Sequence, residues 1–199
     1  MQYGTYLTAL SCSMALGCSA SADLMWDEAF DGDLSGDYLN PTQLSIKGVN
    51  NHVVFTSVDF PGDPDREYFT FTIDEGYELS SVVLDVFDTV PEFNLGFIGI
   101  ASGAQFPTPP SMPDPGEMLG YALIGTSDVG NDILQLMGEG AGSQGISGPL
   151  GAGSYSIWAQ ETSTSLDVWD LNFVVTAVPA PAGLALLGLG GFSTRRRRS

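Results

Sequence analysis

Residues 67–73 alternate large apolar and smaller side chains, and this period of two constrains the fold more than any other stretch of the chain. Phe69, Phe71 and Ile73 fall on one face of an extended strand, with a tyrosine and two threonines on the other. Such a strand has to cover its apolar face, so we expect it at the centre of the fold. No helical periodicity of useful length competes with strand patterns elsewhere in the chain.

Other short stretches with strand-like patterns lie before and after it, at residues 42–49, 52–58, 77–87, 95–101, 118–124, 154–161 and 169–175. The 25 glycines and 12 prolines favour strands joined by tight turns. We therefore predict an all-β fold, a single antiparallel β-sandwich or jelly-roll-like domain over residues 23–177. Two pairs of neighbouring stretches are expected to form hairpins, namely 42–49 with 52–58 and 154–161 with 169–175.

Two further stretches have distinctive compositions. Residues 95–101 are apolar on both faces and contain Gly96 and Gly99, a pattern that predicts a buried strand closely approached by a neighbour. Residues 102–117 contain five prolines, which lack backbone donors, so this segment is predicted to be an exposed loop.

The three tryptophans, Trp26, Trp158 and Trp169, could stack on sugar rings or pack in the core. Trp169 lies in phase with the apolar face of its strand, so we expect it in the core. Trp158 lies out of phase with the apolar face of its strand, which makes it the candidate ligand-binding residue.

Charge is distributed unevenly along the chain. All 24 acidic residues lie between Asp23 and Asp170, and the only basic residues between positions 23 and 178 are Lys47 and Arg66. Nucleic acids bind proteins mainly through lysine and arginine, so a body this anionic excludes nucleic acid as a partner.

The N-terminus has the pattern of a secretion signal. A mildly apolar stretch at residues 6–17 leads to a small-residue cleavage motif with Ala20 and Ala22. We predict residues 1–22 to be a signal peptide cleaved after Ala22. Both cysteines of the chain lie within it, so the exported domain has to be held together by its core.

Residues 178–199 combine a proline motif, an apolar run and an arginine cluster. The motif and the cluster consist of Val178, Pro179, Ala180, Pro181, Arg195, Arg196, Arg197 and Arg198. Arginines resist crossing a membrane, so an apolar helix followed by them can hold a translocated chain at its C-terminus. The alternative is an ordinary short C-terminal helix with a basic end.

This order of parts resembles the PEP-CTERM sorting signal, with alanine at position 180 where the family has glutamate. In that family, a Pro-Glu-Pro motif, a hydrophobic helix and an arginine cluster are processed by exosortase, a membrane-embedded transpeptidase-like enzyme of Gram-negative bacteria. The resemblance implies a short C-terminal hydrophobic helix, transient anchoring in the inner membrane, cleavage near residues 179–181 and delivery to the cell surface or outside the cell.

The body has a second resemblance, carried by residues 63–65, 68–72, 75–77 and 149–155. Over residues 35–177 the chain resembles β-sandwich modules related to bacterial pre-peptidase C-terminal domains. That resemblance implies a noncatalytic accessory or surface domain.

Catalytic motifs are sparse. His52 is the only histidine, no G-x-S-x-G motif occurs, and no cysteine remains after removal of residues 1–22. Thiol chemistry and cysteine-ligated or histidine-rich metal sites are therefore excluded. Carboxylate pairs for glycoside hydrolysis are not excluded by counting, because acidic residues are plentiful. We expect His52 to be a strand or edge residue and the protein to have no catalytic residues.

Two acidic segments are candidates for calcium. Residues 31–36 match the opening of an EF-hand loop, but Thr42 occupies the position of the bidentate glutamate. The second segment supplies carboxylates at the edge of the sandwich, from Asp59, Asp63, Asp65 and Glu67. The alternative is a solvated charged turn. We therefore expect no cofactor and no defined metal ligands, and at most one weak Ca²⁺ site.

Taken together, these patterns predict a noncatalytic secreted protein of the cell surface or extracellular matrix. Its expected partners are the export machinery, the inner membrane transiently, and an exosortase-like enzyme. The alternative is a secreted polysaccharide-binding module, with or without assistance by Ca²⁺, and with exopolysaccharide as the partner. A secreted hydrolase is the third.

Overall fold

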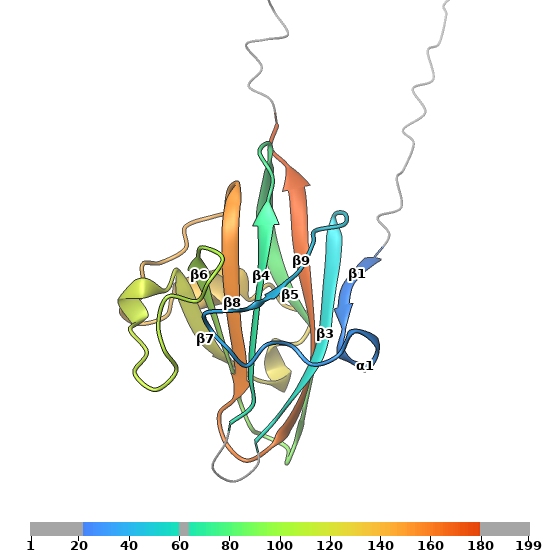
Figure 1. The fold of residues 1–199 in the computed structure, drawn as a ribbon, viewed down its shortest axis with the longest axis vertical. Helices are drawn as coiled ribbons and strands as arrows, with labels where there is room; N and C mark the ends of the chain where they lie inside the picture. The colour runs from blue at the N-terminus through green and yellow to red at the C-terminus, as the bar shows by residue number, and fades with distance from the viewer. Residues whose placement is uncertain (1–21, 60–63, 180–199) are drawn as a thin grey trace, which may run out of the picture.

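The computed structural model describes residues 22–59 and 64–179, and strands dominate this part of the chain (Figure 1). The first sheet has the order β1 (Ala22–Asp27), β3 (Asn50–Val58), β9 (Leu166–Ala177) and β5 (Tyr77–Val90). The second has the order β2 (Thr42–Gln43), β4 (Arg66–Ile73), β8 (Gly153–Glu161), β6 (Gly96–Ser102) and β7 (Gly120–Ile124). Short helical turns complete the described elements: α1 (Glu28–Asp31), η1 (Pro115–Glu117), η2 (Thr126–Asp128) and α2 (Leu134–Gly138).

The predicted all-β class is confirmed, but the sheets are mixed rather than antiparallel. β1 pairs with β3 in parallel, and β2 pairs with β4 in parallel, while the other neighbouring strands are antiparallel. A parallel pair cannot be closed by a tight turn, so the chain has to cross over between such partners. Here it crosses by leaving one sheet for the other between β1 and β3 and between β2 and β4.

Both predicted hairpins are wrong. β2 and β3 belong to different sheets, and so do β8 and β9. Alternation shows which side chains share a face but does not identify the neighbouring strand. β8 and β9 instead lie in opposite sheets and both contribute side chains to the core, where Ile157 and Trp169 are fully buried. The segment 162–165 therefore links the two sheets.

The two sheets pack face to face through aromatic side chains. Phe55 of the four-stranded sheet contacts Phe69 of the five-stranded sheet, with ring centroids 6.3 Å apart. Trp169 stacks on Phe55 at 5.4 Å, and its Nε1 donates a hydrogen bond to Ser57 Oγ at 3.1 Å. The expectation that Trp169 lies in the core is confirmed.

Gly96 makes the close approach that its sequence context predicted. A Cβ atom built at Gly96 would lie 2.4 Å from two ring atoms of Trp169 and 2.9 Å from the Phe87 ring. Real Cβ atoms do not approach carbon so closely, so only glycine leaves room for the tryptophan at this point in β6.

Residues 28–41, between β1 and β2, form a segment that crosses from one sheet to the other. It forms α1 and then passes from the edge of the first sheet to that of the second, where Ser35 bridges to Tyr68 and β2 pairs with β4 (Figure 1). The core side chain Leu34 lies in this segment and is buried. The segment thus joins the β1–β3 edge to the β2–β4 edge.

The described chain begins and ends at the same end of the four-stranded sheet (Figure 1). Ala22 pairs with Asn50, and Asn50 pairs with Val174 near the end of β9. The predicted signal peptide up to residue 21 and the tail from residue 180 lie outside the described residues. No helix in the described part of the chain is long and apolar enough to cross a membrane.

Candidate functional site

A second aromatic cluster lies on the outer face of the five-stranded sheet, away from the core. This outer cluster has a buried centre of Tyr68, Ala101, Phe106, Met118 and Trp158, with Tyr38, Phe97 and Tyr121 packed around it. Trp158 lies at its middle, with ring centroids 4.7 Å from Phe97, 5.6 Å from Phe106 and 5.7 Å from Tyr68. Trp158 points away from the core, in keeping with its out-of-phase position in the strand.

The proline-rich segment 102–117 covers part of this cluster. Phe106 and Thr108 are buried, and Phe106 N donates to Tyr38 O at 2.9 Å. Asp114 N donates to Thr108 Oγ1 at 2.8 Å, which closes the loop on itself. The prediction of an exposed loop is therefore only partly right. Its tip is exposed, but Phe106 fixes its start to the sheet because an aromatic ring gains more from burial than from solvent.

An open hollow of about 450 Å³ lies between this loop and the sheet. It is lined by aromatic, proline and polar side chains, namely Arg66, Phe97, Pro110, Pro113, Pro115, Met118, Tyr121, Trp158, Gln160 and Thr162. Apolar walls with a few polar groups are the usual composition of small-molecule sites.

The polar groups of the hollow are only partly satisfied by the protein. Trp158 Nε1 donates to Gln160 Oε1 at 3.0 Å, and Gln160 Nε2 donates to Glu161 O at 3.2 Å. Arg66 Nε and the neighbouring Tyr68 hydroxyl have no hydrogen-bond partner among the described residues. Burial raises the pKa of Tyr68, so its hydroxyl keeps its proton at neutral pH and remains a donor.

Trp158 itself is only 4% exposed, so it forms the floor of the hollow rather than an open platform. Phe97 and Tyr121 are half-buried, and their rings stack at 6.0 Å beside Trp158. A ligand in the hollow would reach these two rings as well as Trp158. Neither ring was predicted as part of a site, although Phe97 and Tyr121 occupy outward positions in stretches that were correctly predicted as strands.

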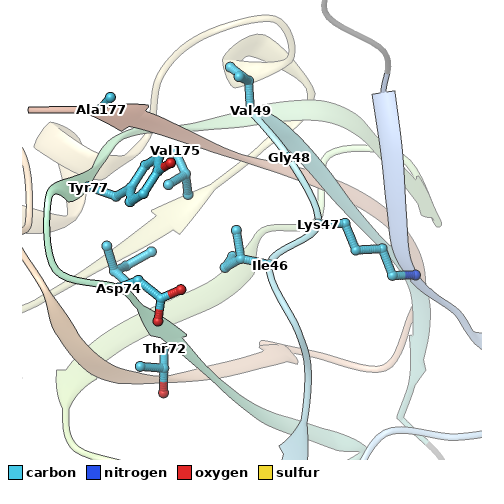
Figure 2. A pocket seen from close by; sticks show the side chains of 10 residues that line it. Ile46, Lys47, Gly48, Val49, Thr72, Asp74, Tyr77, Val175 and Ala177 are labelled. Atoms are coloured by element: carbon cyan, nitrogen blue, oxygen red, sulfur yellow. The ribbon is translucent and has the colours of Figure 1, made fainter.

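A second hollow, of about 420 Å³, lies at the end of the body where the chain leaves β9 (Figure 2). Ile46, Tyr77 and Val175 line it, and Asp74 supplies a carboxylate. Figure 2 shows Lys47 extending away from this space, and Lys47 Nζ donates to Leu24 O in β1. This hollow is therefore largely apolar.

His52 lies on the outer face of the four-stranded sheet, between two carboxylates. His52 Nδ1 is 2.9 Å from Asp170 Oδ1 and 3.6 Å from Asp85 Oδ2. The three residues come from the neighbouring strands β3, β9 and β5, and all three are partly exposed. The predicted position of His52 on a strand is confirmed, but its two acidic neighbours were not predicted from the sequence.

The structure regroups the predicted calcium residues. Asp33, from the EF-hand-like segment, and Glu67, from the second acidic segment, each place a carboxylate oxygen within 4.8 Å of the other and of Glu28. Asp31 and Asp65 serve the backbone instead, because Asp31 Oδ2 accepts from Asp27 N and Asp65 Oδ2 accepts from Val58 N.

The other residues of the second acidic segment do not join this group. Asp59 Oδ2 accepts a long hydrogen bond from Thr164 Oγ1 at 3.4 Å, and Asp63 lies outside the described residues.

The predicted processing residues lie mostly outside the described part of the chain. Val178 and Pro179 are exposed, and Val178 N donates to Gly76 O at 2.8 Å. Ala22 opens β1. The predicted residues Ala20, Ala180, Pro181, Arg195, Arg196, Arg197 and Arg198 fall outside the described residues.

Comparison with known proteins adds no relative from which a role could be transferred. No family model, no curated protein and no solved structure matches the chain. A functional interpretation therefore has to come from its own residues and their arrangement.

Proposed function

We propose that the chain is a noncatalytic exported β-sandwich protein of the cell surface or extracellular matrix. In this proposal, residues 1–22 direct export and are removed, and residues 178–199 act as a sorting tail for an exosortase-like enzyme. The inner membrane holds the tail only transiently, through its apolar run and arginines. The body would then serve as a structural or adhesive component.

The supporting observation is that Ala22 and Pro179 lie at the same end of the body. Ala22 is level with Asn50, which is level with Val174 in β9. The ends of β3, β5 and β9 at Val58, Val90 and Leu166 form the opposite end. A body attached through either terminal segment would thus direct that opposite end, and the long sides of both sheets, away from the membrane.

The acidic body suits this role. Its carboxylates repel one another and anionic lipid headgroups, which favours solubility and keeps the body off the membrane surface. The exposed position of Val178 and Pro179 leaves the proposed cleavage region accessible to a processing enzyme.

Intact-mass analysis of the protein recovered from its native cells and from the medium tests this proposal. We expect loss of residues 1–22 and a new C-terminus near residues 179–181, with or without an added group. Substitution of the four arginines by glutamine should leave unprocessed protein in the cells. Cytoplasmic protein that retains both Met1 and Ser199 under native expression would contradict the proposal.

A second candidate function, binding of an extracellular polysaccharide, is favoured by the hollow at Trp158. The apolar face of a sugar ring can stack on Trp158, Phe97 or Tyr121, while its hydroxyl groups can reach Arg66 and Gln160. The open shape of the hollow and its position on the outer face of the sheet suit a segment of a long chain.

A glycan array probed with the full chain tests this second candidate. We expect saturable binding that is lost in Tyr121→Ala and in Trp158→Ala but kept in Tyr77→Ala, which removes an exposed tyrosine beside the other hollow. Circular dichroism would establish that each variant is folded. Equal binding by all three variants would exclude the hollow at Trp158 as the glycan site.

The third alternative, a secreted hydrolase, has less support. The groups nearest His52 Nδ1 are the carboxylates of Asp170 and Asp85, which can orient or charge an imidazole but are not the hydroxyl nucleophile of a catalytic triad.

A further inference from the structure

We propose that Glu28, Asp33 and Glu67 form a Ca²⁺ site that joins the β1–β3 edge of one sheet to the β2–β4 edge of the other. This proposal is independent of the exported role and of the glycan hollow. Each of the three residues offers a carboxylate oxygen, and these oxygens lie within 4.8 Å of one another. That spacing allows one cation with Ca–O distances of about 2.3–2.6 Å to be reached by all three after small side-chain adjustments.

Glu67 is the residue that indicates a ligand rather than a solvated acidic turn. It is 0% exposed, and neither Oε1 nor Oε2 has a hydrogen-bond partner among the described residues. It lies two positions before Phe69 on the core-facing side of β4. A buried carboxyl without partners is costly, and a bound cation would satisfy both of its oxygens.

Glu28 brings the second carboxylate from the other sheet. β1 stops pairing with β3 at Asp27 and Val54, and Glu28 follows directly. Glu28 Oε2 accepts hydrogen bonds from Thr56 N at 2.5 Å and from Thr56 Oγ1 at 2.8 Å. These bonds take the place of a continued strand partner for Thr56 and hold the Glu28 carboxylate in position near Asp33 and Glu67.

Asp33 supplies the third carboxylate from the segment that crosses between the sheets. It is exposed, and the next residue, Leu34, is buried in the core and fixes this part of the segment. Trp26 Nε1 donates to Gly32 O at 3.0 Å, which ties the crossing segment to β1 just before Asp33. Asp33 thus faces the solvent side of the site, where water can complete the coordination.

The donor set favours Ca²⁺ over Mg²⁺. Three carboxylates with water on one side can provide the six to eight oxygens that Ca²⁺ accepts in an irregular arrangement. Mg²⁺ demands a near-octahedral arrangement and gives up its water reluctantly, which a buried glutamate disfavours. The partly exposed site suggests the weak affinity of extracellular modules, with a Kd of about 10⁻⁴–10⁻³ M.

The proposed site has a structural consequence. Its three ligands come from α1 beside β3, from the crossing segment and from β4, so a bound ion would hold both sheets together at an edge where β2 contributes only two residues. Calcium should therefore stabilise this edge and protect the backbone amides of residues 28–35 and 66–68 from hydrogen exchange.

Calorimetry and thermal unfolding of the full chain, with CaCl₂ or MgCl₂ after EDTA treatment and at constant ionic strength, test the site. We expect saturable heat and a higher unfolding midpoint with millimolar Ca²⁺. The same response should require a Mg²⁺ concentration at least about tenfold higher. Absence of any Ca²⁺ response, or an equal response to Mg²⁺, would overturn the assignment.

Variants locate the binding. Asp33→Asn changes one exposed side chain and should weaken Ca²⁺ binding by about tenfold or more without preventing folding, and Glu67→Gln should abolish it. The matched control is Asp88→Asn, which removes an exposed carboxylate from β5 and should bind as the wild type does. Wild-type affinity in both ligand variants, or equal weakening in the control, would contradict the proposal.

Terbium luminescence adds a readout that does not depend on stability. Tb³⁺ occupies Ca²⁺ sites. Trp26 is hydrogen-bonded to Gly32, the residue before Asp33, and can sensitise the emission of Tb³⁺ bound there. We expect sensitised Tb³⁺ emission that decreases when Ca²⁺ displaces Tb³⁺. Trp26→Phe should lose this emission but retain Ca²⁺ binding as measured by calorimetry. Emission unaffected by Asp33→Asn would place the ion elsewhere and overturn the site.

Discussion

Two aromatic clusters lie on opposite sides of the five-stranded sheet, and they are built differently. The inner cluster around Trp169 is enclosed by both sheets, and Trp169 is 0% exposed. The outer cluster around Trp158 is covered on one side by the segment 102–117 and opens into a hollow on the other. Similar side chains therefore form a closed core in one place and a lined depression in the other.

The difference shows what a covering layer does. A second sheet presents a continuous row of apolar side chains and leaves little space, whereas a loop covers only what its few anchored residues reach. Phe106 is such an anchor, while the prolines beyond it line the rim of the hollow. We expect the inner cluster to contribute mainly to stability and the outer cluster to contribute to both stability and binding.

The largest expected effect comes from truncating the inner tryptophan. Trp169→Ala should reduce the free energy of unfolding by about 3–5 kcal/mol, because the closed core cannot fill the cavity. Trp158→Ala should cost less, about 2–3 kcal/mol, because the adjoining hollow lets water and loop side chains move in. Urea unfolding followed by circular dichroism measures the free energy of unfolding of both variants. Equal losses would show that the inner and outer clusters are packed equally tightly.

Glu67 lies on the core-facing side of the five-stranded sheet and makes the stability of the protein depend on pH. Burial, and then the neighbouring carboxylates Asp65 and Asp33, raise the pKa of Glu67 from 4.5 to about 9. Without a bound cation, the folded protein therefore holds a proton on Glu67 that the unfolded chain releases above its lower pKa. This contribution to stability is complete below about pH 4.5 and is lost as the pH rises to about 9.

In EDTA, the wild type should lose stability relative to Glu67→Gln between pH 5.5 and 8.5, by up to about 1.4 kcal/mol per pH unit. Urea unfolding of both proteins at matched pH and salt measures the difference. Parallel pH profiles for the two proteins would show that Glu67 is not held neutral in the folded state.

Gly96→Ala tests how tightly the inner cluster is closed. The added methyl group would meet the Trp169 ring at 2.4 Å, and both rings beside it are buried, so we expect a loss of about 1–3 kcal/mol. Gly130→Ala is not a suitable control because its φ of +83° adds backbone strain, whereas Gly151→Ala meets nothing within 4 Å and has no such strain. Thermal unfolding of Gly96→Ala and Gly151→Ala would show whether the loss is specific to packing.

The smallest effect on stability is expected at the rim of the outer cluster. Tyr121→Ala removes a half-buried ring and the hydrogen bond from its hydroxyl to Ala141 O, and should cost about 1 kcal/mol. Tyr121→Phe should cost less, because it removes only the hydroxyl group. Chemical unfolding of both variants measures these costs, and a loss as large as that of Trp169→Ala would show that the rim is part of a closed core.

Parts of the candidate sites were predictable from local patterns. The out-of-phase position of Trp158 placed it on the outer face, and the glycines of residues 95–101 indicated the close packing seen at Gly96. The acidic segments pointed to Asp33 and Glu67 as carboxylate donors. Glu28 was missed, because it lies next to Thr56 only after β1 and β3 have paired.

The sequence by itself determined the strand class, the faces of individual strands and the acidic character of the body, because side-chain alternation and charge are local properties. Only the tertiary structure decided which strands became neighbours, and it replaced both expected hairpins with crossings between sheets. It likewise brought Glu28, Asp33 and Glu67 together from separate segments. Strand pairing and ligand grouping depend on contacts between residues far apart in the chain, and a single sequence contains no local signal for them.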